Sequence, residues 1–206
     1  MNADRRENFM NKITTSSAAA QLERMYDDLN KAFFEGKLPD AIITLKCTKG
    51  AYGHFTTGQI WRVDESTHKH EINISSATLD RPALQTAATL LHEMVHFYCH
   101  INNIRDTSNH GVYHNHKYKE AALDHGLLVF YVKYYGWTNT QPSDALRLLA
   151  VENAWPQIKL AEDTRSYTAG PSSTRKYLCP QCGLTCRATK KVNLICGDCK
   201  LPLLEV

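Results

Sequence analysis

The chain has 206 residues, of which 43% are apolar and 22% are charged, enough for one domain with a small module attached. This composition excludes a chain that is disordered throughout. No run approaches the 18 apolar residues of a membrane span, and the polar, charged start is not a secretory signal. We therefore expect no membrane partner and a cytoplasmic, reducing location, where the 7 cysteines are metal ligands or core residues rather than disulfides.

The net charge of +3 is unevenly distributed. Residues 1–163 hold 17 Lys and Arg against 19 Asp and Glu, whereas residues 164–206 hold 7 against 2. A short basic tail on a near-neutral body is typical of an appendage that contacts nucleic acid. It is equally typical of a solvated tail, so the charge alone does not decide between them.

In the first half of the chain, the spacing of the apolar residues changes once. Residues 1–16 show no usable period and are expected to be disordered or frayed. From Ser17, apolar residues three and four apart continue to Phe33 and predict a helix that Gly36 ends. Alternation between about residues 41 and 75 then predicts a small antiparallel sheet.

The second half opens on the most regular helix of the chain. Asp80 followed by Pro82 predicts a side-chain-capped helix start, and the apolar stripe continues to about Ile101. After a polar loop, the pattern predicts a helix at 115–125, a strand at 127–135 and a helix at 142–153. Together these elements predict an α+β domain over residues 17–161.

The central helix carries the pattern His92-Glu-Met-Val-His96. At 3.6 residues per turn, His92 and His96 lie one above the other, so both imidazoles can reach one zinc ion. Glu93 lies close enough to hold a zinc-bound water as general base. The pattern therefore predicts a zinc site inside this helix.

A catalytic zinc needs a third protein ligand. His100 shares the helix face but lies about 12 Å from His92 along the axis, too far to bind the same ion. The candidates that remain lie in or after the returning loop: His110, His114, His116 and Glu120.

These residues resemble the SprT-like zinc metalloproteases, the family that contains the Spartan DNA–protein crosslink proteases. The resemblance rests on His92-Glu-Met-Val-His96, the polar loop, and His114-Asn-His-Lys-Tyr118. It implies a zincin-like minimal metalloprotease domain in which His114 is the third ligand and Tyr118 the aromatic residue four positions later. Family members often have Gly directly after the third ligand, where this chain has Asn115.

A second metal motif lies near the C-terminus. Cys179, Cys182, Cys196 and Cys199 have the spacing C-x2-C-x13-C-x2-C, which predicts a structural zinc ribbon over residues 175–206. Residues 162–174 are rich in turn formers and are expected to be a linker. Cys186 falls outside the pattern, and Cys47 and Cys99 are assigned to packing.

Basic residues surround the predicted knuckles of the ribbon. They are Arg175, Lys176, Arg187, Lys190 and Lys191. Such side chains can neutralise phosphates, and the neighbouring Tyr177 can stack on a base. Charge on a ribbon can also reflect the lack of a core, but the family resemblance favours DNA contact.

The sequence thus predicts a metallopeptidase with one catalytic and one structural zinc ion. Its expected substrates are DNA-bound or DNA-crosslinked proteins, and its expected location is the cytoplasm in association with DNA or the nucleoid. The alternative is a non-enzymatic DNA-binding protein in which both zinc sites are structural and His110 or His116 supplies a fourth ligand. A zinc hydrolase acting on a small molecule is a third possibility. The sequence leaves the oligomeric state open.

Overall fold

The computed structural model describes residues 14–48, 50–160 and 174–206. The chain divides into two compact units, residues 1–162 and 163–206, and each is described by itself. The predicted linker at 162–174 lies outside the described residues except for Thr174, and so do residues 1–13 of the predicted frayed segment.

Helix α2 (Thr15–Phe33) begins two residues before the predicted start. The reason is a capping box, in which the Thr14 hydroxyl accepts from the Ser17 backbone N–H and the Ser17 hydroxyl accepts from the Thr14 backbone N–H. Residues 15 and 16 are therefore helical rather than frayed. The buried stripe of α2 includes Leu22 and Leu29, which have no exposed surface.

The first sheet has the order β1-β3-β2 and contains β1 (Ile42–Thr44), β2 (Gly53–Arg62) and β3 (His68–Ile74). Strands β2 and β3 pair antiparallel, but β1 runs parallel to β3, so the prediction of an antiparallel sheet was wrong for β1. Since β3 is inserted between the other two strands, the chain crosses over after β1. The buried Glu71 on β3 accepts hydrogen bonds from Thr44 and Trp61 on both neighbours.

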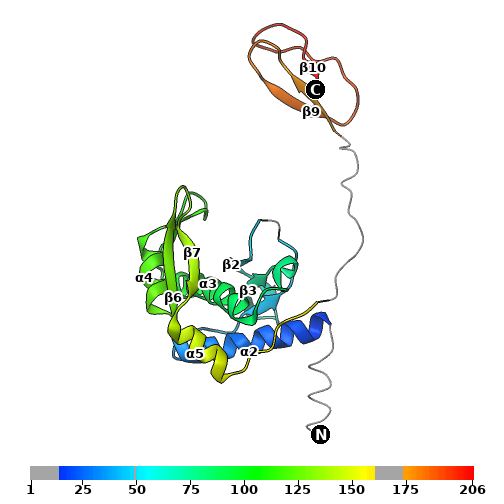
Figure 1. Cartoon of the computed structure of the whole chain (residues 1–206). Helices are drawn as coiled ribbons and strands as arrows, with labels where there is room; N and C mark the ends of the chain where they lie inside the picture. The colour runs from blue at the N-terminus through cyan, green and yellow to red at the C-terminus, as the bar shows by residue number, and fades with distance from the viewer. Residues whose placement is uncertain (1–13, 49, 161–173) are drawn as a thin grey trace. The chain divides into compact units, whose positions relative to one another are not determined.

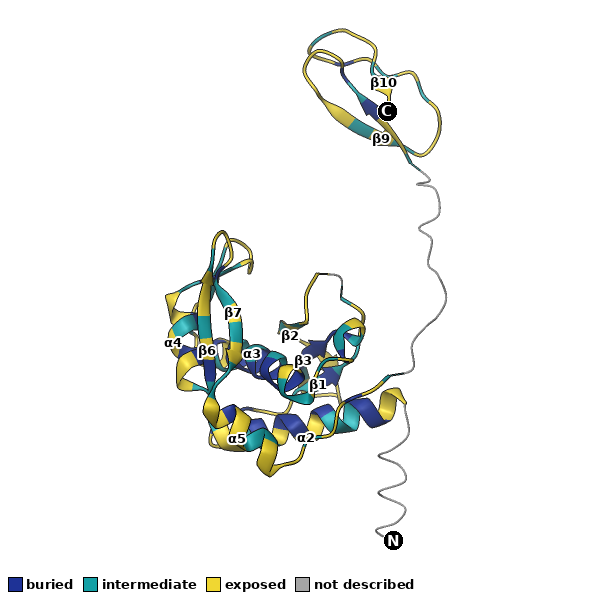
Figure 2. Cartoon of the chain, viewed as in Figure 1, coloured by how far each residue is buried: buried dark blue, intermediate teal, exposed yellow. Residues whose placement is uncertain are grey.

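Helix α3 (Ala83–Ile101) follows a short 3-10 turn, η1 (Ser76–Thr78). Pro82, not Asp80, occupies the N-cap position, and no side chain caps this helix. Pro82 has an extended ψ of 142° at a φ of −50°, and its ring disfavours a helical conformation of the preceding Arg81, so the helix does not extend further back. Figure 2 shows α3 buried along most of its length, as expected for the central helix of the core.

The second sheet has the order β4-β5-β7-β6 and lies across α3 from the first (Figure 1). Its strands are β4 (Thr107–Ser108), β5 (Tyr113–His114), β6 (Leu127–Val132) and β7 (Gly136–Pro142). Helix α4 (His116–Asp124) packs on β6, and α5 (Asp144–Glu152) closes the unit beside α3. The mixed α+β class predicted from the sequence is confirmed.

The C-terminal unit is a small sheet of order β10-β8-β9, with β8 (Arg175–Leu178), β9 (Thr185–Ala188) and β10 (Leu204–Glu205). The turn between β8 and β9 contains the first cysteine pair. Among its described residues only Tyr177, Cys179 and Cys196 are buried. So small a core cannot account for a stable fold without a metal ion.

In the part of the chain that the structure describes, no helix combines the length and the apolar character needed to cross a bilayer.

Candidate metal centres

Helix α3 supplies three of the predicted site residues. His92 and His96 are one turn apart on the same face, as the spacing requires, and Glu93 points from the adjacent position. Leu91, Met94 and Val95 are fully buried around them. Packing of these apolar neighbours therefore fixes the rotation of the helix and the direction of both imidazoles.

His114 arrives from β5, which pairs parallel with β7 at Gly136. At Gly136 the backbone has φ +73°, and a Cβ there would lie 2.1 Å from the His114 carbonyl oxygen. Only glycine permits this approach. The pairing fixes the backbone of His114 opposite α3.

The ring nitrogens of the three histidines form a nearly equilateral triangle. The Nε2 atoms of His92 and His114 are 3.2 Å apart, those of His96 and His92 are 3.2 Å apart, and those of His96 and His114 are 3.1 Å apart. Tetrahedral zinc with bonds of 2.0–2.1 Å places its nitrogen ligands about 3.3 Å apart. The three imidazoles therefore fit a zinc ion without rearrangement.

Two residues that the sequence analysis missed orient the imidazoles from behind. Asp106 Oδ2 lies 2.5 Å from His96 Nδ1, and Thr140 Oγ1 lies 3.0 Å from His92 Nδ1. A proton on His96 Nδ1, donated to the Asp106 carboxylate, leaves the lone pair of Nε2 for a metal. The sequence contains only a weak signal for the role of Asp106, which is that an acidic residue stands in the loop after the helix. Nothing in the sequence indicates Thr140, because it reaches His92 only through the tertiary fold.

Glu93 is buried beside the histidines, with 6% of its surface exposed. Burial raises the pKa of Glu93 to about 7, although His96 and the backbone N–H of Phe55 act in the opposite direction. Gly53 at the start of β2 makes room for the carboxylate. A Cβ on Gly53 would lie 3.2 Å from Glu93 Oε1 and 2.8 Å from the Asn73 carbonyl oxygen.

Tyr118 forms the floor of the histidine cluster. Its ring centroid lies 4.9 Å from that of His92, 4.6 Å from that of His96 and 4.7 Å from that of His114. The hydroxyl is buried without a hydrogen-bond partner among the described residues, and burial raises its pKa well above the ordinary value. Tyr118 therefore packs against the imidazoles with its ring.

Burial also lowers the pKa of two of the imidazoles. The pKa of His92 falls well below its ordinary value, and that of His114 falls to about 4, because burial and the neighbouring His96 disfavour a positive charge. Both rings are therefore neutral at pH 7, which is the form that binds a metal.

Asn115 explains the departure from the family pattern after the third histidine. Its side chain accepts from the backbone N–H groups of Lys117 and Tyr118, which caps α4, and it donates to the Arg105 carbonyl. The asparagine thus starts the helix that carries Tyr118 and ties it to the loop of Asp106.

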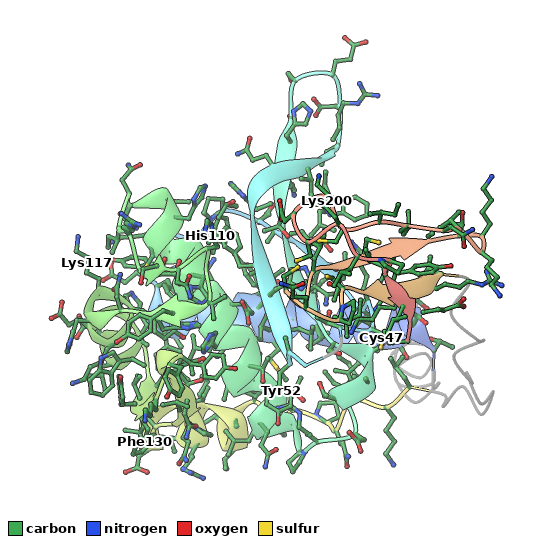
Figure 3. All side chains as sticks on the ribbon, turned by 90° about the horizontal axis from the view of Figure 1, so that it is seen from above. Cys47, Tyr52, His110, Lys117, Phe130 and Lys200 are labelled. Carbon is green, nitrogen blue, oxygen red and sulfur yellow. The ribbon has the colours of Figure 1, made fainter. Side chains whose placement is uncertain are left out.

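The other candidates for a third or fourth ligand lie outside the cluster. His110, His116 and Glu120 are exposed, and none of them belongs to the group of His92, His96 and His114. His110 is labelled in Figure 3. His116 instead packs against Trp137, and His100 packs against His70. Within the described ranges, therefore, no fourth protein ligand completes this site.

A cleft of about 1220 Å³ opens onto the histidines. Its lining includes Gly53–Phe55 of β2, Thr138–Pro142 of β7, and the α3 face that carries Glu93. The histidine cluster is thus accessible from the cleft, and the largely buried Glu93 forms part of the cleft wall.

The four motif cysteines also come together. One sulfur atom from each of Cys179, Cys182, Cys196 and Cys199 lies within 4.8 Å of the others, and Cys186 is not part of the group. Backbone N–H groups of Cys182 and Gln181 lower the pKa of the Cys179 thiol to about 7. The hydrogen bond to Cys182 raises the pKa of Cys199 to about 12. The donor set and its compactness fit a structural zinc ion.

The remaining cysteines divide by burial. Cys99 is buried in α3, as the assignment to packing requires. Cys47 is exposed, so that assignment was wrong for it (Figure 3). Strand β1 ends at Thr44, so Cys47 lies beyond the part of the sheet that packs on the core.

The predicted DNA-contacting residues are all exposed on the ribbon. Arg175 forms an ion pair with Glu205 at 3.2 Å, whereas Lys176 and Arg187 face each other across β8 and β9. Tyr177 is buried, and its hydroxyl accepts from the Val192 backbone N–H. It therefore cannot stack on a base, and this prediction was wrong because Tyr177 faces inward on β8.

Comparison with known proteins identifies one relationship. The model of the SprT-like family matches residues 22–127, a range that contains all three histidines, Glu93 and Tyr118. No curated protein and no solved structure matches the chain.

Proposed function

Because the chain belongs to the SprT-like family, we propose that it is a zinc-dependent endopeptidase with a zincin-like catalytic domain. One observation carries this proposal. Three histidine nitrogens within 3.2 Å of one another lie beside a buried carboxylate in an open cleft, and the described residues provide no fourth ligand. A structural site is closed by four protein ligands, whereas a catalytic site keeps a position for water.

His92, His96 and His114 would hold the zinc ion. When bound, the ion lowers the pKa of a coordinated water to around 7 and polarises the substrate carbonyl. Asp106 keeps the proton of His96 on Nδ1, and Thr140 orients His92 through its Nδ1 atom. Both contacts hold the Nε2 atoms toward the cleft before a ligand arrives.

Glu93 is the general base of the proposed reaction. With a pKa of about 7 its carboxylate can accept a proton from the attacking water and return it to the leaving amine near neutral pH. Gly53 holds open the space that the carboxylate needs. Burial in the wall of the cleft restricts the water molecules that compete for this proton.

The competing function is a non-enzymatic DNA-binding protein with two structural zinc sites. It needs a fourth ligand at the histidine site, and His110 and His116 are exposed outside the cluster. X-ray absorption distinguishes the two functions, because beside the four sulfur ligands expected at the ribbon ion, three imidazoles plus one further light atom favour the enzyme and four imidazoles favour a closed site.

Substitution of Glu93 tests the catalytic assignment. We expect Glu93→Gln to retain both zinc ions and to lower proteolysis of a DNA-bound protein by at least 100-fold, a typical contribution of a general base. Glu120→Gln is the matched control, since Glu120 is an exposed carboxylate on α4. A Glu93→Gln enzyme that cleaves at the wild-type rate, or chelator-insensitive cleavage by the wild type, refutes the assignment.

We further propose that the ribbon contacts DNA and that the substrates are DNA-bound or DNA-crosslinked proteins. Lys176 and Arg187 support this, because two cations directly opposite in a sheet repel each other unless an anion lies between them. Neither forms an ion pair among the described residues. Lys190 and Lys191 extend the basic surface beyond β9.

The double variant Lys190→Glu with Lys191→Glu tests this contact. Binding to an oligonucleotide should weaken, and the slope of log affinity against log salt should become shallower by roughly 1.5, because each lost phosphate contact contributes about 0.7–0.9. The control is Lys37→Glu, which makes the same change of charge at one lysine of the N-terminal unit. Unchanged affinity at low salt would remove the basic-ribbon proposal.

A further inference from the structure

Arg81 lines the same cleft as the histidine cluster and Glu93. It lies between η1 and α3, and its guanidinium carbon is 4.1 Å from the centroid of the Tyr52 ring. Tyr52 directly precedes β2 and is labelled in Figure 3. An arginine stacked on an aromatic ring loses little further freedom when it binds a ligand.

Hydrogen bonds fix the guanidinium in place. Nε donates to the Thr78 carbonyl over 2.8 Å, and Nη2 donates to Thr89 Oγ1 over 3.2 Å. Thr89 is itself anchored to the Gln85 carbonyl. No described residue accepts a hydrogen bond from Nη1, so this group and its two protons are available to a ligand in the cleft.

Arg81 forms no ion pair with any residue that the structure describes. Asp80 is near enough to favour its charged form, but makes no such contact. Among the described residues, the carboxylates that line the cleft are Glu93, which is buried, and Asp106, which is bound to His96. Arg81 is therefore a positioned cation to which the described part of the cleft offers no matching anion. Charge-assisted hydrogen bonds from a guanidinium group to a carboxylate are among the strongest hydrogen bonds in proteins.

The anchor of Arg81 places it close to the proposed reaction centre. Thr89 lies three residues before His92, so the two side chains are neighbours on the helix surface. An extended peptide advances about 3.3 Å per residue. A side chain that reaches Arg81 would therefore belong to a residue roughly two to four positions from the cleaved bond.

We propose that Arg81 makes the enzyme selective for substrates with aspartate or glutamate at one fixed position near the cleaved peptide bond. This inference rests on the proposed endopeptidase function. A peptide carboxylate is favoured over a DNA phosphate because, among the described residues, Arg147 is the one other Lys or Arg that lines the cleft, whereas a DNA backbone requires a series of cations.

The test begins with a peptide mixture cleaved by the zinc-loaded full chain. Mass spectrometry of the products should show Asp and Glu enriched at one position. Two peptides that differ only by Glu or Gln at that position then give the selectivity. We expect kcat/KM to favour Glu about tenfold in the wild type, as for one charge-assisted hydrogen bond.

Variants of Arg81 test whether this residue causes the preference for Glu. Arg81→Gln should cleave the two peptides equally, and Arg81→Glu should prefer Lys at the same position. Arg81→Lys retains the charge without the fork and should keep a smaller preference for Glu. Arg147→Gln is the matched control and should keep the wild-type preference. Thermal unfolding shows whether each variant is folded.

Binding separates this inference from the proposed function. The Glu93→Gln variant, which is expected not to hydrolyse, should still bind the Glu peptide about tenfold more tightly than the Gln peptide by fluorescence anisotropy. This preference supports the inference even if the wild type proves unable to cleave. Equal binding of both peptides overturns it, and so does an Arg81→Gln variant that weakens only oligonucleotide binding, since Arg81 would then serve a phosphate.

Discussion

Asp106 offers a direct test of how the histidine site is held. Its carboxylate lies 2.5 Å from His96 Nδ1, and the two side chains are only 15% and 14% exposed, so solvent screens this contact little. The Asp106 carbonyl separately accepts the Asn115 backbone N–H, which anchors the loop regardless of the side chain. A substitution therefore removes the contact to His96 with little effect on the backbone.

The size of the effect follows from the kind of bond that is lost. Asp106→Asn keeps an acceptor oxygen but loses the charge, which changes a bond of about 1.5–3 kcal/mol into one of about 0.5–1.5 kcal/mol. The midpoints of these ranges differ by about 1.2 kcal/mol, which corresponds to a roughly eightfold weaker zinc affinity. Asp106→Ala removes the acceptor and should cost 10–100-fold, the usual range for a residue that supports a metal ligand.

Competition with a chromophoric chelator measures this affinity. The full chain has two sites, and the cysteine site serves as an internal reference that Asp106 should not affect. Asp144→Asn, which changes a fully exposed carboxylate at the start of α5, is the control. Equal affinities of Asp106→Asn and wild type, within about twofold, would refute the positioning of His96 by Asp106. Loss of affinity at both sites would show a general effect on the fold.

Three further predictions address packing and the second metal site. Tyr118→Phe should raise the free energy of unfolding by about 1 kcal/mol in urea denaturation, because it removes a buried hydroxyl without a described partner and keeps the ring; a destabilised variant would show that the hydroxyl is bonded. Gly53→Ala should destabilise by about 1–3 kcal/mol in the same assay and reduce proteolysis, since its Cβ would meet the Asn73 carbonyl and Glu93; wild-type values of both would contradict this. Chelation of zinc should abolish the amide dispersion of residues 174–206 in NMR spectra while the N-terminal unit stays folded, because the ribbon buries little besides Tyr177 and two cysteines; persistent dispersion would mean that the ribbon folds without metal.

Sequence patterns predicted the features of this protein that depend on residues close together in the chain. The helix that carries His92 and His96 follows from periodicity, and the cysteine pairs follow from their spacing. His114 was selected by family resemblance, because the residues alone left His110, His116 and Glu120 open. The structure brings His114 to the other two histidines through the pairing of β5 with β7, which no local pattern encodes.

The contacts that complete the site are made by residues that only the tertiary fold brings together. Strand β7 was not predicted, since its polar residues give no apolar alternation, and Thr140 was missed with it. The direction of β1 beside β3 was predicted wrongly, because a short strand gives no signal of direction. No local pattern reveals the role of Gly53, which is to leave space for Glu93.

The two metal centres differ in the number of protons that a metal ion must displace. His92 and His114 are uncharged at neutral pH, so capture of an ion by the histidine triangle releases few protons, and its strength should vary little with mild acidification. The Cys199 thiol holds its proton until well above neutrality, so each ion captured by the ribbon acidifies the solution. Falling pH should consequently weaken zinc binding more steeply at the ribbon than at the histidine triangle, so acidification would act differently on the proposed DNA contact and on the proposed hydrolysis.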